Sequence, residues 1–130
     1  MLTLKKSLGQ NLLIDKNIIN KILCLTNIKN KNVLEIGPGT GNLTRYIFEK
    51  RPNSLLLIEK DKKFCDLLNL KFNNLKNYKI INEDILKFNL NSNFKGEIVF
   101  GNLPYNISTQ ILIKFIKLDP WPPKFDKLIF

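Results

Sequence analysis

Between residues 35 and 44 the chain reads Glu35-Ile36-Gly37-Pro38-Gly39-Thr40-Gly41-Asn42-Leu43-Thr44. The apolar run at residues 32–36 has the length of a strand, and a segment with helical periodicity follows the glycines. Glycine permits a tight strand-to-helix turn and lets backbone amides come close to a ligand. The stretch therefore predicts the first βα turn of an α/β domain, with a purely structural turn as the alternative to a ligand-binding one.

Strands and helices alternate along the rest of the chain, which predicts a doubly wound parallel sheet. Further strands are expected at residues 55–58, 78–81 and 97–100, and another begins near residue 125. Asp15 and Ser108 are expected to cap helices. The expected apolar helix positions are Ile18, Ile19, Ile22, Leu23 and Leu25, then Leu43, Ile47 and Phe48, then Phe64, Leu67, Leu68 and Phe72, and last Ile111, Leu112, Phe115 and Ile116. Because the sequence ends inside an apolar strand, we expect residues 1–130 to be an incomplete domain, truncated in its fifth strand.

Acidic residues follow two of the expected strands. Glu59 ends the second strand, 22 positions after Gly37 (59 − 37), close to the ~20 expected for a carboxylate that binds ribose hydroxyls. Asp84 follows the third strand and can accept a hydrogen bond from the amine of an adenine, with Ile85 as an apolar wall. Asn42 stands where a dinucleotide fingerprint has glycine, and no Gly-Lys-Ser/Thr ending is present. The pattern predicts a nucleoside site that is neither an NAD site nor a P-loop.

The loop after the fourth strand, residues 101–109, reads Gly-Asn-Leu-Pro-Tyr-Asn-Ile-Ser-Thr. The Asn102 side chain can accept a hydrogen bond from an exocyclic amine, and the Leu103 carbonyl can accept a second one. Pro104 removes a backbone donor, and the Tyr105 ring can stack on a base. These residues predict a cradle for an amino-bearing nucleobase, and an ordinary strand-to-helix turn is the alternative.

Composition narrows the class of protein. The net charge is +10, from 21 Lys and Arg against 11 Asp and Glu, which favours polyanionic partners, although AT-rich coding alone would also enrich lysine and asparagine. Histidine is absent, so no histidine base or histidine metal ligand exists, and no metal site is expected. Cys24 and Cys65 are expected to be reduced core thiols. No apolar run approaches the ~20 residues of a membrane span, and a cytoplasmic protein is expected.

A family resemblance rests on motifs in a fixed order. These are Lys-Ser-Leu-Gly-Gln-Asn-Leu-Leu (6–13), the glycine-rich stretch, Ile-Glu-Lys-Asp (58–61), Asn-Glu-Asp (82–84) and the 101–109 loop. Together they resemble the ribosomal RNA adenine N6-dimethyltransferase family, which dimethylates two adjacent adenosines of small-subunit rRNA. The similarity runs from about Lys5 to Phe130. It implies a class I methyltransferase with a Rossmann-like sheet that binds S-adenosylmethionine.

The resemblance also assigns roles to residues. The implied cofactor contacts are Asn11, Leu13, Gly37, Glu59, Asp84 and Asn102, and Tyr105 is implied to stack on the target base. With the residues that the pattern itself predicts, the expected cofactor site also includes Gly39 and Ile85, and the expected catalytic residues are Asn102, Leu103, Pro104 and Tyr105. Residues 7–13 could equally be a leader without a role in binding. Leu12 stands where the family usually has phenylalanine. The family continues into further strands and a helical RNA-binding domain, which these 130 residues do not supply.

The expected partner is small-subunit rRNA or the immature small subunit, and the protein is expected to be a monomer without membrane association. Three alternatives stay open. The first is the sister family that methylates large-subunit rRNA and confers antibiotic resistance, and the second is a non-catalytic RNA-binding or assembly relative. The third, a small-molecule methyltransferase, is disfavoured by the basic charge and the base-cradle loop.

Overall fold

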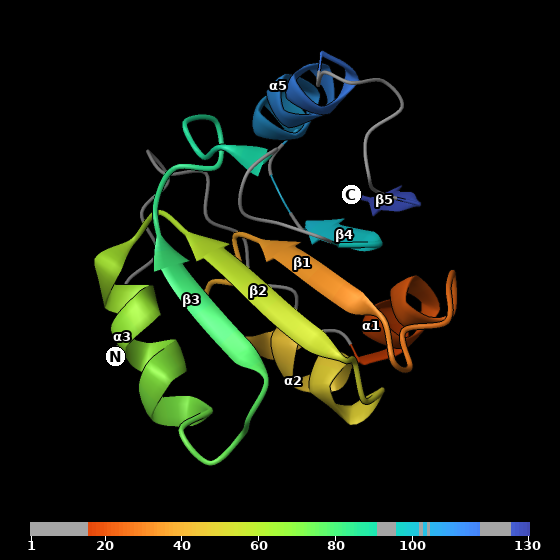
Figure 1. Ribbon diagram of the computed structural model, residues 1–130, viewed down its shortest axis with the longest axis vertical. Coiled ribbons are helices and arrows are strands. Elements are labelled where there is room, and N and C mark those ends of the chain that lie inside the picture. The colour runs from red at the N-terminus through yellow and green to blue at the C-terminus, as the bar shows by residue number, and fades with distance from the viewer. Residues whose placement is uncertain (1–15, 91–95, 102, 104, 118–125) are drawn as a thin grey trace.

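Five parallel strands form one sheet in the computed structural model, which describes residues 16–90, 96–101, 103, 105–117 and 126–130 (Figure 1). The strand order is β3-β2-β1-β4-β5. The elements are α1 (Lys16–Leu23), β1 (Asn32–Ile36), α2 (Asn42–Glu49), β2 (Ser54–Glu59), α3 (Lys62–Lys71), β3 (Tyr78–Asn82), β4 (Ile98–Gly101), α5 (Tyr105–Ile116) and β5 (Lys127–Ile129). The five predicted strands are therefore confirmed.

The strand order reverses between β1 and β4. From β1 the chain proceeds outward through β2 and β3, and β4 then returns to the other side of β1. The register pairs Ile36 with Ile58 of β2 and with Gly101 of β4. In open parallel sheets, ligands bind outside the carboxyl ends of the strands at such a reversal. The glycine-rich turn follows the end of β1 here, and β4 ends beside it at Gly101, four residues before α5 begins.

Apolar side chains fill both faces of the sheet, as expected for parallel strands buried on both sides. Val33 packs with residues of α1 and α2, such as Ile19 and Ile47. Leu34 packs on the other face with Ile111 and Phe115 of α5. Accordingly, α5 lies across the sheet from α1 and α2 (Figure 1).

Some helix expectations were wrong. Ile18, Leu112 and Ile116 are exposed, because only one side of α1 and of α5 meets the sheet, and Leu25 is exposed beyond the end of α1. Ser108 does not cap a helix, since α5 begins at Tyr105 and places Ser108 within its first turn. Asp15 lies outside the described residues.

The two cysteines differ in burial. Cys65 is buried as expected, but Cys24 is exposed just beyond the end of α1, so the expectation of a core thiol at that position was wrong. No helix among the described residues is long and apolar enough to cross a membrane.

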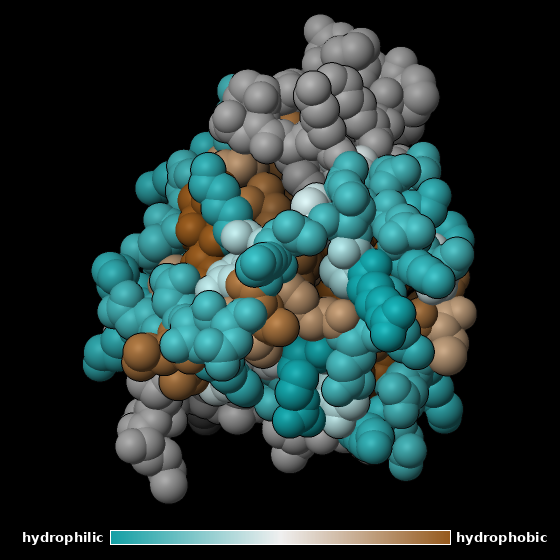
Figure 2. Space-filling view, turned by 60° about the horizontal axis from the view of Figure 1, so that its bottom comes forward, coloured by the Kyte–Doolittle hydropathy of each residue, from teal (hydrophilic) through white to brown (hydrophobic). Residues whose placement is uncertain are grey.

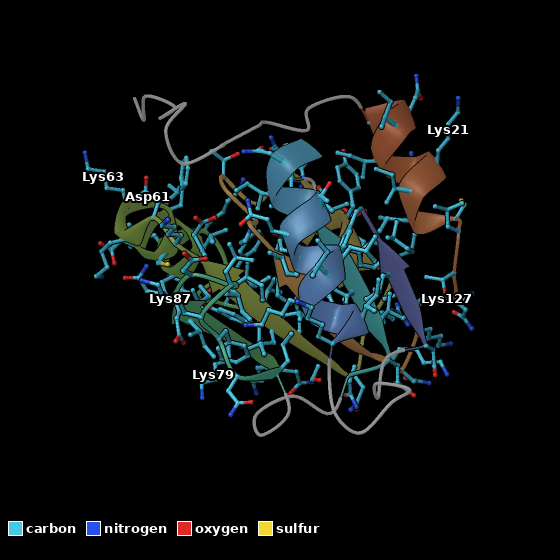
Figure 3. All side chains as sticks on the ribbon, turned by 90° about the horizontal axis from the view of Figure 1, so that it is seen from above. Lys21, Asp61, Lys63, Lys79, Lys87 and Lys127 are labelled. Carbon is cyan, nitrogen blue, oxygen red and sulfur yellow. The ribbon has the colours of Figure 1, made fainter. Side chains whose placement is uncertain are left out.

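The lysines labelled in Figure 3 do not gather on one face of the molecule. Figure 3 shows Lys21, Lys63, Lys79, Lys87 and Lys127 at widely separated points around the molecule. Figure 2 likewise shows hydrophilic residues spread over the face it presents, interrupted by smaller apolar areas. The charge surplus therefore does not by itself locate a nucleic-acid interface.

Candidate cofactor and substrate site

The turn after β1 is tight at one glycine and open at another. Gly37 and Gly39 have φ angles of 67° and 58°, in the left-handed region that glycine adopts without strain. A Cβ atom on Gly37 would lie 2.9 Å from Cδ2 of Leu103, whereas a Cβ on Gly39 would have no atom of the described residues within 4 Å. Among the described residues, the turn therefore packs against Leu103 at Gly37 and leaves space for a ligand beside Gly39.

Glu59 fastens this turn to the end of β2. Its side chain is buried, and Oε2 accepts a hydrogen bond of 3.0 Å from the Gly39 amide. Oε1 accepts one of 2.9 Å from the Asp61 amide. Burial raises the pKa of Glu59, and the two backbone donors oppose that rise. A carboxylate offers about four lone-pair sites, so each oxygen keeps capacity for a ligand hydroxyl.

The backbone at the ends of β2 and β3 is held by residues that sequence reasoning missed. Asn82 Nδ2 donates to the carbonyls of Glu59 and Lys60, both at 3.0 Å. The buried thiol of Cys65 lies 3.5 Å from the same Glu59 carbonyl. The Asn-Glu-Asp motif drew attention to this strand end, but the motif alone did not show that Asn82 fixes the neighbouring strand.

Asp84 forms a tight turn after β3. Its Oδ1 accepts from the Leu86 amide at 3.0 Å, and Oδ2 lies 3.5 Å from Nζ of Lys60. Its carbonyl accepts from the amides of Lys87 and Phe88. Ile85 is 6% exposed and packs with the α5 face of the core, so its expected role as a ligand wall stays a prediction.

A second buried carboxyl lies beneath the glycine-rich turn. Glu35 of β1 is 2% exposed, and its Oε2 accepts a 2.6 Å hydrogen bond from the fully buried hydroxyl of Thr44 in α2. The pKa of Glu35 is raised to about 8, chiefly by burial; the Thr44 hydrogen bond opposes this rise, and the nearby Glu59 adds to it. Both residues belong to the glycine-rich motif, but the sequence alone did not predict a role for either. The signal was available, because an acid inside an apolar strand must be buried.

Lysine contributes another contact to this turn. Lys71, the last residue of α3, donates from Nζ to the carbonyl of Thr40 at 2.9 Å. Its pKa is lowered, first by burial and then by the nearby Arg45. The glycine-rich turn is thus held from both sides, by Glu59 through an amide and by Lys71 through a carbonyl.

Leu103 is the part of the base-cradle motif that the structure describes most fully. Its side chain lies against Gly37 and Gly101, and its carbonyl accepts a long hydrogen bond of 3.4 Å from Oγ of Ser108. Tyr105 is the first residue of α5. Five predicted site residues lie wholly or partly outside the described part of the chain: Asn11, Leu13, Asn102 and Pro104 entirely, and Tyr105 in its side chain.

The described site residues share one edge of the sheet. Contacts link Gly39 to Glu59, Gly37 to Leu103, and Asp84 to Lys60, the residue after Glu59. Among the described residues no group of His, Cys, Asp and Glu could hold a metal ion. A cavity of about 460 Å³ lies elsewhere, lined by residues 23–24, 26–29 and 49–51 before β1 and β2, away from the strands' carboxyl ends.

Solved structures with similar folds are methyltransferases. The dimethyladenosine transferase from Plasmodium falciparum superposes with a TM-score of 0.73 at 28% identity, covering 85% of this chain and 40% of that one. The 23S rRNA methyltransferase ErmE gives a TM-score of 0.73 at 26% identity, covering 88% of this chain and 45% of that one. The predicted Rossmann-like class I methyltransferase fold is confirmed.

Sequence comparison identifies the family. Ribosomal RNA small subunit methyltransferase A from Pelagibacter ubique is 55% identical over 113 residues, which is 86% of this chain and 42% of the relative. The protein of that name from Mycoplasmopsis synoviae is 45% identical over 114 residues, 87% of this chain and 43% of the relative. The chain thus spans less than half the length of these relatives. The family model described as ribosomal RNA adenine dimethylase matches residues 1–128, and the chain belongs to that family.

Proposed function

We propose that the protein transfers methyl groups from S-adenosylmethionine to the N6 amines of two adjacent adenosines in small-subunit rRNA. The observation that most directly supports this proposal is that the base-cradle loop follows the sheet beside the glycine-rich turn. Gly101 pairs with Ile36 across β4 and β1, and Leu103 packs against Gly37. The glycine-rich turn and the base-cradle loop therefore meet at one edge of the sheet. The substrate class in this proposal comes from the names of the relatives, which are small-subunit rRNA methyltransferases.

The residues at this edge fit an adenosine-bearing cofactor. The space beside Gly39 admits a ligand close to the backbone, and Glu59 keeps lone pairs for ribose hydroxyls. Asp84 accepts from the adenine amine, with Ile85 beside it. Asn11 and the Leu13 backbone take the amino-acid end. When bound, S-adenosylmethionine supplies an electrophilic methyl group.

The target base is held by the loop before α5. An adenine amine is a poor nucleophile, because its lone pair is delocalised into the ring. In this proposal the Asn102 side chain and the Leu103 carbonyl each accept one N–H of that amine, which favours a nitrogen with an available lone pair. Ser108 uses part of the accepting capacity of Leu103 and leaves a second lone pair. Pro104 contributes no competing donor, and the Tyr105 ring stacks on the base.

Positioning is then the main catalytic contribution. The product amine loses its proton to solvent after methyl transfer, so no strong base is needed. A chain without histidine agrees with this scheme. The test is methyl incorporation into RNA of purified small subunits by wild type, Asn102→Ala and Asn69→Ala. Asn69 is an exposed asparagine of α3 and serves as the matched control. Loss of activity in the Asn102 variant alone supports the proposal, and a wild-type rate in that variant contradicts it.

A second candidate function is methylation of large-subunit rRNA. It is favoured by the TM-score of 0.73 to ErmE, equal to that of the dimethyladenosine transferase. The same assay on purified large subunits separates the two, because each candidate predicts incorporation into one subunit only. RNA binding with no methyl incorporation into either would instead indicate a non-catalytic relative.

We also propose a domain organisation, a location and an oligomeric state for the protein. Residues 1–130 provide the cofactor-binding methyltransferase part, and the protein acts as a cytoplasmic monomer on the immature small subunit. Sedimentation analysis tests the monomer. Gel-shift titration with small-subunit rRNA tests whether these residues bind RNA without further chain.

A further inference from the structure

Lys114 joins α5 to the turn that follows β3. It lies in the last turn of α5 and is half-buried, and its Nζ donates a 2.8 Å hydrogen bond to the carbonyl of Leu86. Burial lowers the pKa of Lys114, and the nearby Asp84 and Glu83 carboxylates oppose that change. A half-buried ammonium that is hydrogen-bonded to a backbone carbonyl is a fixed contact, unlike an exposed surface lysine.

The Leu86 peptide groups connect Lys114 to Asp84. The Leu86 amide donates to Oδ1 of Asp84 at 3.0 Å, while the Leu86 carbonyl accepts from Lys114. One residue therefore carries the contact from α5 to the carboxylate that the proposed function assigns to the adenine amine. The apolar neighbours reinforce this arrangement, since Ile85 and Phe115 pack in one cluster.

The same helix carries the base loop at its other end. α5 begins at Tyr105, directly after the segment proposed to hold the target base, and Lys114 lies nine positions further on. At 1.5 Å per residue this separation is about 14 Å along a rigid rod. The helix thus touches the cofactor's proposed adenine side and the substrate base loop at once.

We propose that Lys114 is a positioning residue, which fixes the Asp84 turn against α5 and so sets the adenine-binding groups relative to the base loop. The inference rests on the proposed function for the roles of Asp84 and of the base loop. The contact between Lys114 and the turn does not depend on that function. The Lys114 contact and its effect on ligand binding can therefore be tested separately.

The first arm tests the contact by amide hydrogen exchange. Lys114→Met keeps most of the side-chain stem and removes the donor, while Lys117→Met is the matched control at an exposed lysine near the same helix end. We expect exchange across residues 84–88 to accelerate several-fold in Lys114→Met, with little change in Lys117→Met. Lys114→Arg, which keeps a donor, should restore part of the protection. Unchanged exchange in Lys114→Met would overturn the inference without touching the proposed function.

The second arm tests the consequence with two ligands. S-adenosylhomocysteine carries the adenine amine, and its inosine analogue has a carbonyl in that place. We expect wild type to prefer the adenine ligand by about tenfold or more, the effect of one hydrogen bond to a charged acceptor. The preference should shrink to about threefold or less in Lys114→Met and persist in Lys117→Met.

General destabilisation of the protein would weaken the binding of both ligands equally and leave the ratio of their affinities unchanged. That result would overturn the positioning role of Lys114. In the methylation assay, Lys114→Met should raise the KM for S-adenosylmethionine more than it lowers kcat. If wild type bound neither ligand, the proposed function would fall, while the exchange arm would still report on the contact.

Discussion

The buried carboxyl of Glu35 should make the stability of the protein depend on pH. Its pKa is raised from 4.5 to about 8, mainly by burial, so the folded protein keeps a proton that the unfolded chain releases. Below pH 4.5 both states are protonated and the contribution is fully present. As pH rises toward 8 the unfolded state alone ionises, and stability falls. Above that pH both states are ionised and the contribution has been lost.

The size of the effect follows from the shift. Within this window one proton per molecule costs about 1.4 kcal/mol of stability for each pH unit. Between pH 5 and pH 7.5 the free energy of unfolding should therefore fall by roughly 3 kcal/mol through this group. Glu59, whose pKa is also raised, contributes in the same direction, so a variant is needed to isolate Glu35.

The assay is urea unfolding of wild type, Glu35→Gln and Glu49→Gln at several pH values from 5 to 8. Glutamine cannot ionise, but its amide oxygen can still accept from the Thr44 hydroxyl. Glu35→Gln should resemble wild type near pH 5 and become the more stable protein by pH 8. Glu49 is exposed, so its variant should follow wild type throughout. Parallel curves for wild type and Glu35→Gln would refute the coupling between Glu35 ionisation and folding.

Three further predictions concern the proposed site. Glu59→Ala should weaken S-adenosylhomocysteine binding by about 1–3 kcal/mol in calorimetry, through lost charge-assisted hydrogen bonds, while Glu49→Ala should not; equal affinities would remove Glu59 from the site. Gly39→Ala should cost roughly 1 kcal/mol of stability in thermal unfolding from its positive φ, and should weaken ligand binding further by filling the space beside the turn; undiminished binding would place the ligand elsewhere. Tyr105→Ala should lose about 1–3 kcal/mol of base stacking with cofactor affinity retained, and Tyr105→Phe should stay near wild type in methyl incorporation; equal damage by both would assign the hydroxyl a chemical role.

The strands were predictable because a parallel sheet buries both faces of each strand. Such strands appear as short continuous apolar runs, and residues 32–36 match β1 at both ends. The helices were less predictable, because an apolar residue on a helix can face the core or the solvent. In α5 the side of Ile111 and Phe115 meets the sheet, whereas Leu112 is 43% exposed. The hydrophobic periodicity of a helix indicates which side of it could be buried. Only the packing of the helix against the sheet shows which of those positions are covered.

The start of α5 shows how local chemistry can mislead. Ser108 was a reasonable cap by residue type, since serine often accepts from the amides of a helix's first turn. In the structure its hydroxyl donates backward to the Leu103 carbonyl. α5 begins at Tyr105, four residues before the start that a cap at Ser108 would give, so the base-cradle loop is shorter than the sequence pattern predicted.

The meeting of the candidate site residues at one sheet edge was predictable, whereas the contacts that hold them there were not. Polar residues directly after buried strands must meet at one edge of a parallel sheet, and spacing alone therefore brought Glu59 near the glycine-rich turn. The bonds from Glu59 to Gly39, from Lys71 to Thr40 and from Lys114 to Leu86 each join segments that are distant in sequence. In all three hydrogen bonds one partner is a backbone amide or carbonyl. Because every residue type has these backbone groups, the sequence does not indicate which of them will bind a side chain. A single sequence therefore indicates the residues proposed to face the ligand more clearly than it indicates the residues that hold them in place. The structure is consequently most useful for choosing variants of the residues that hold the site in place.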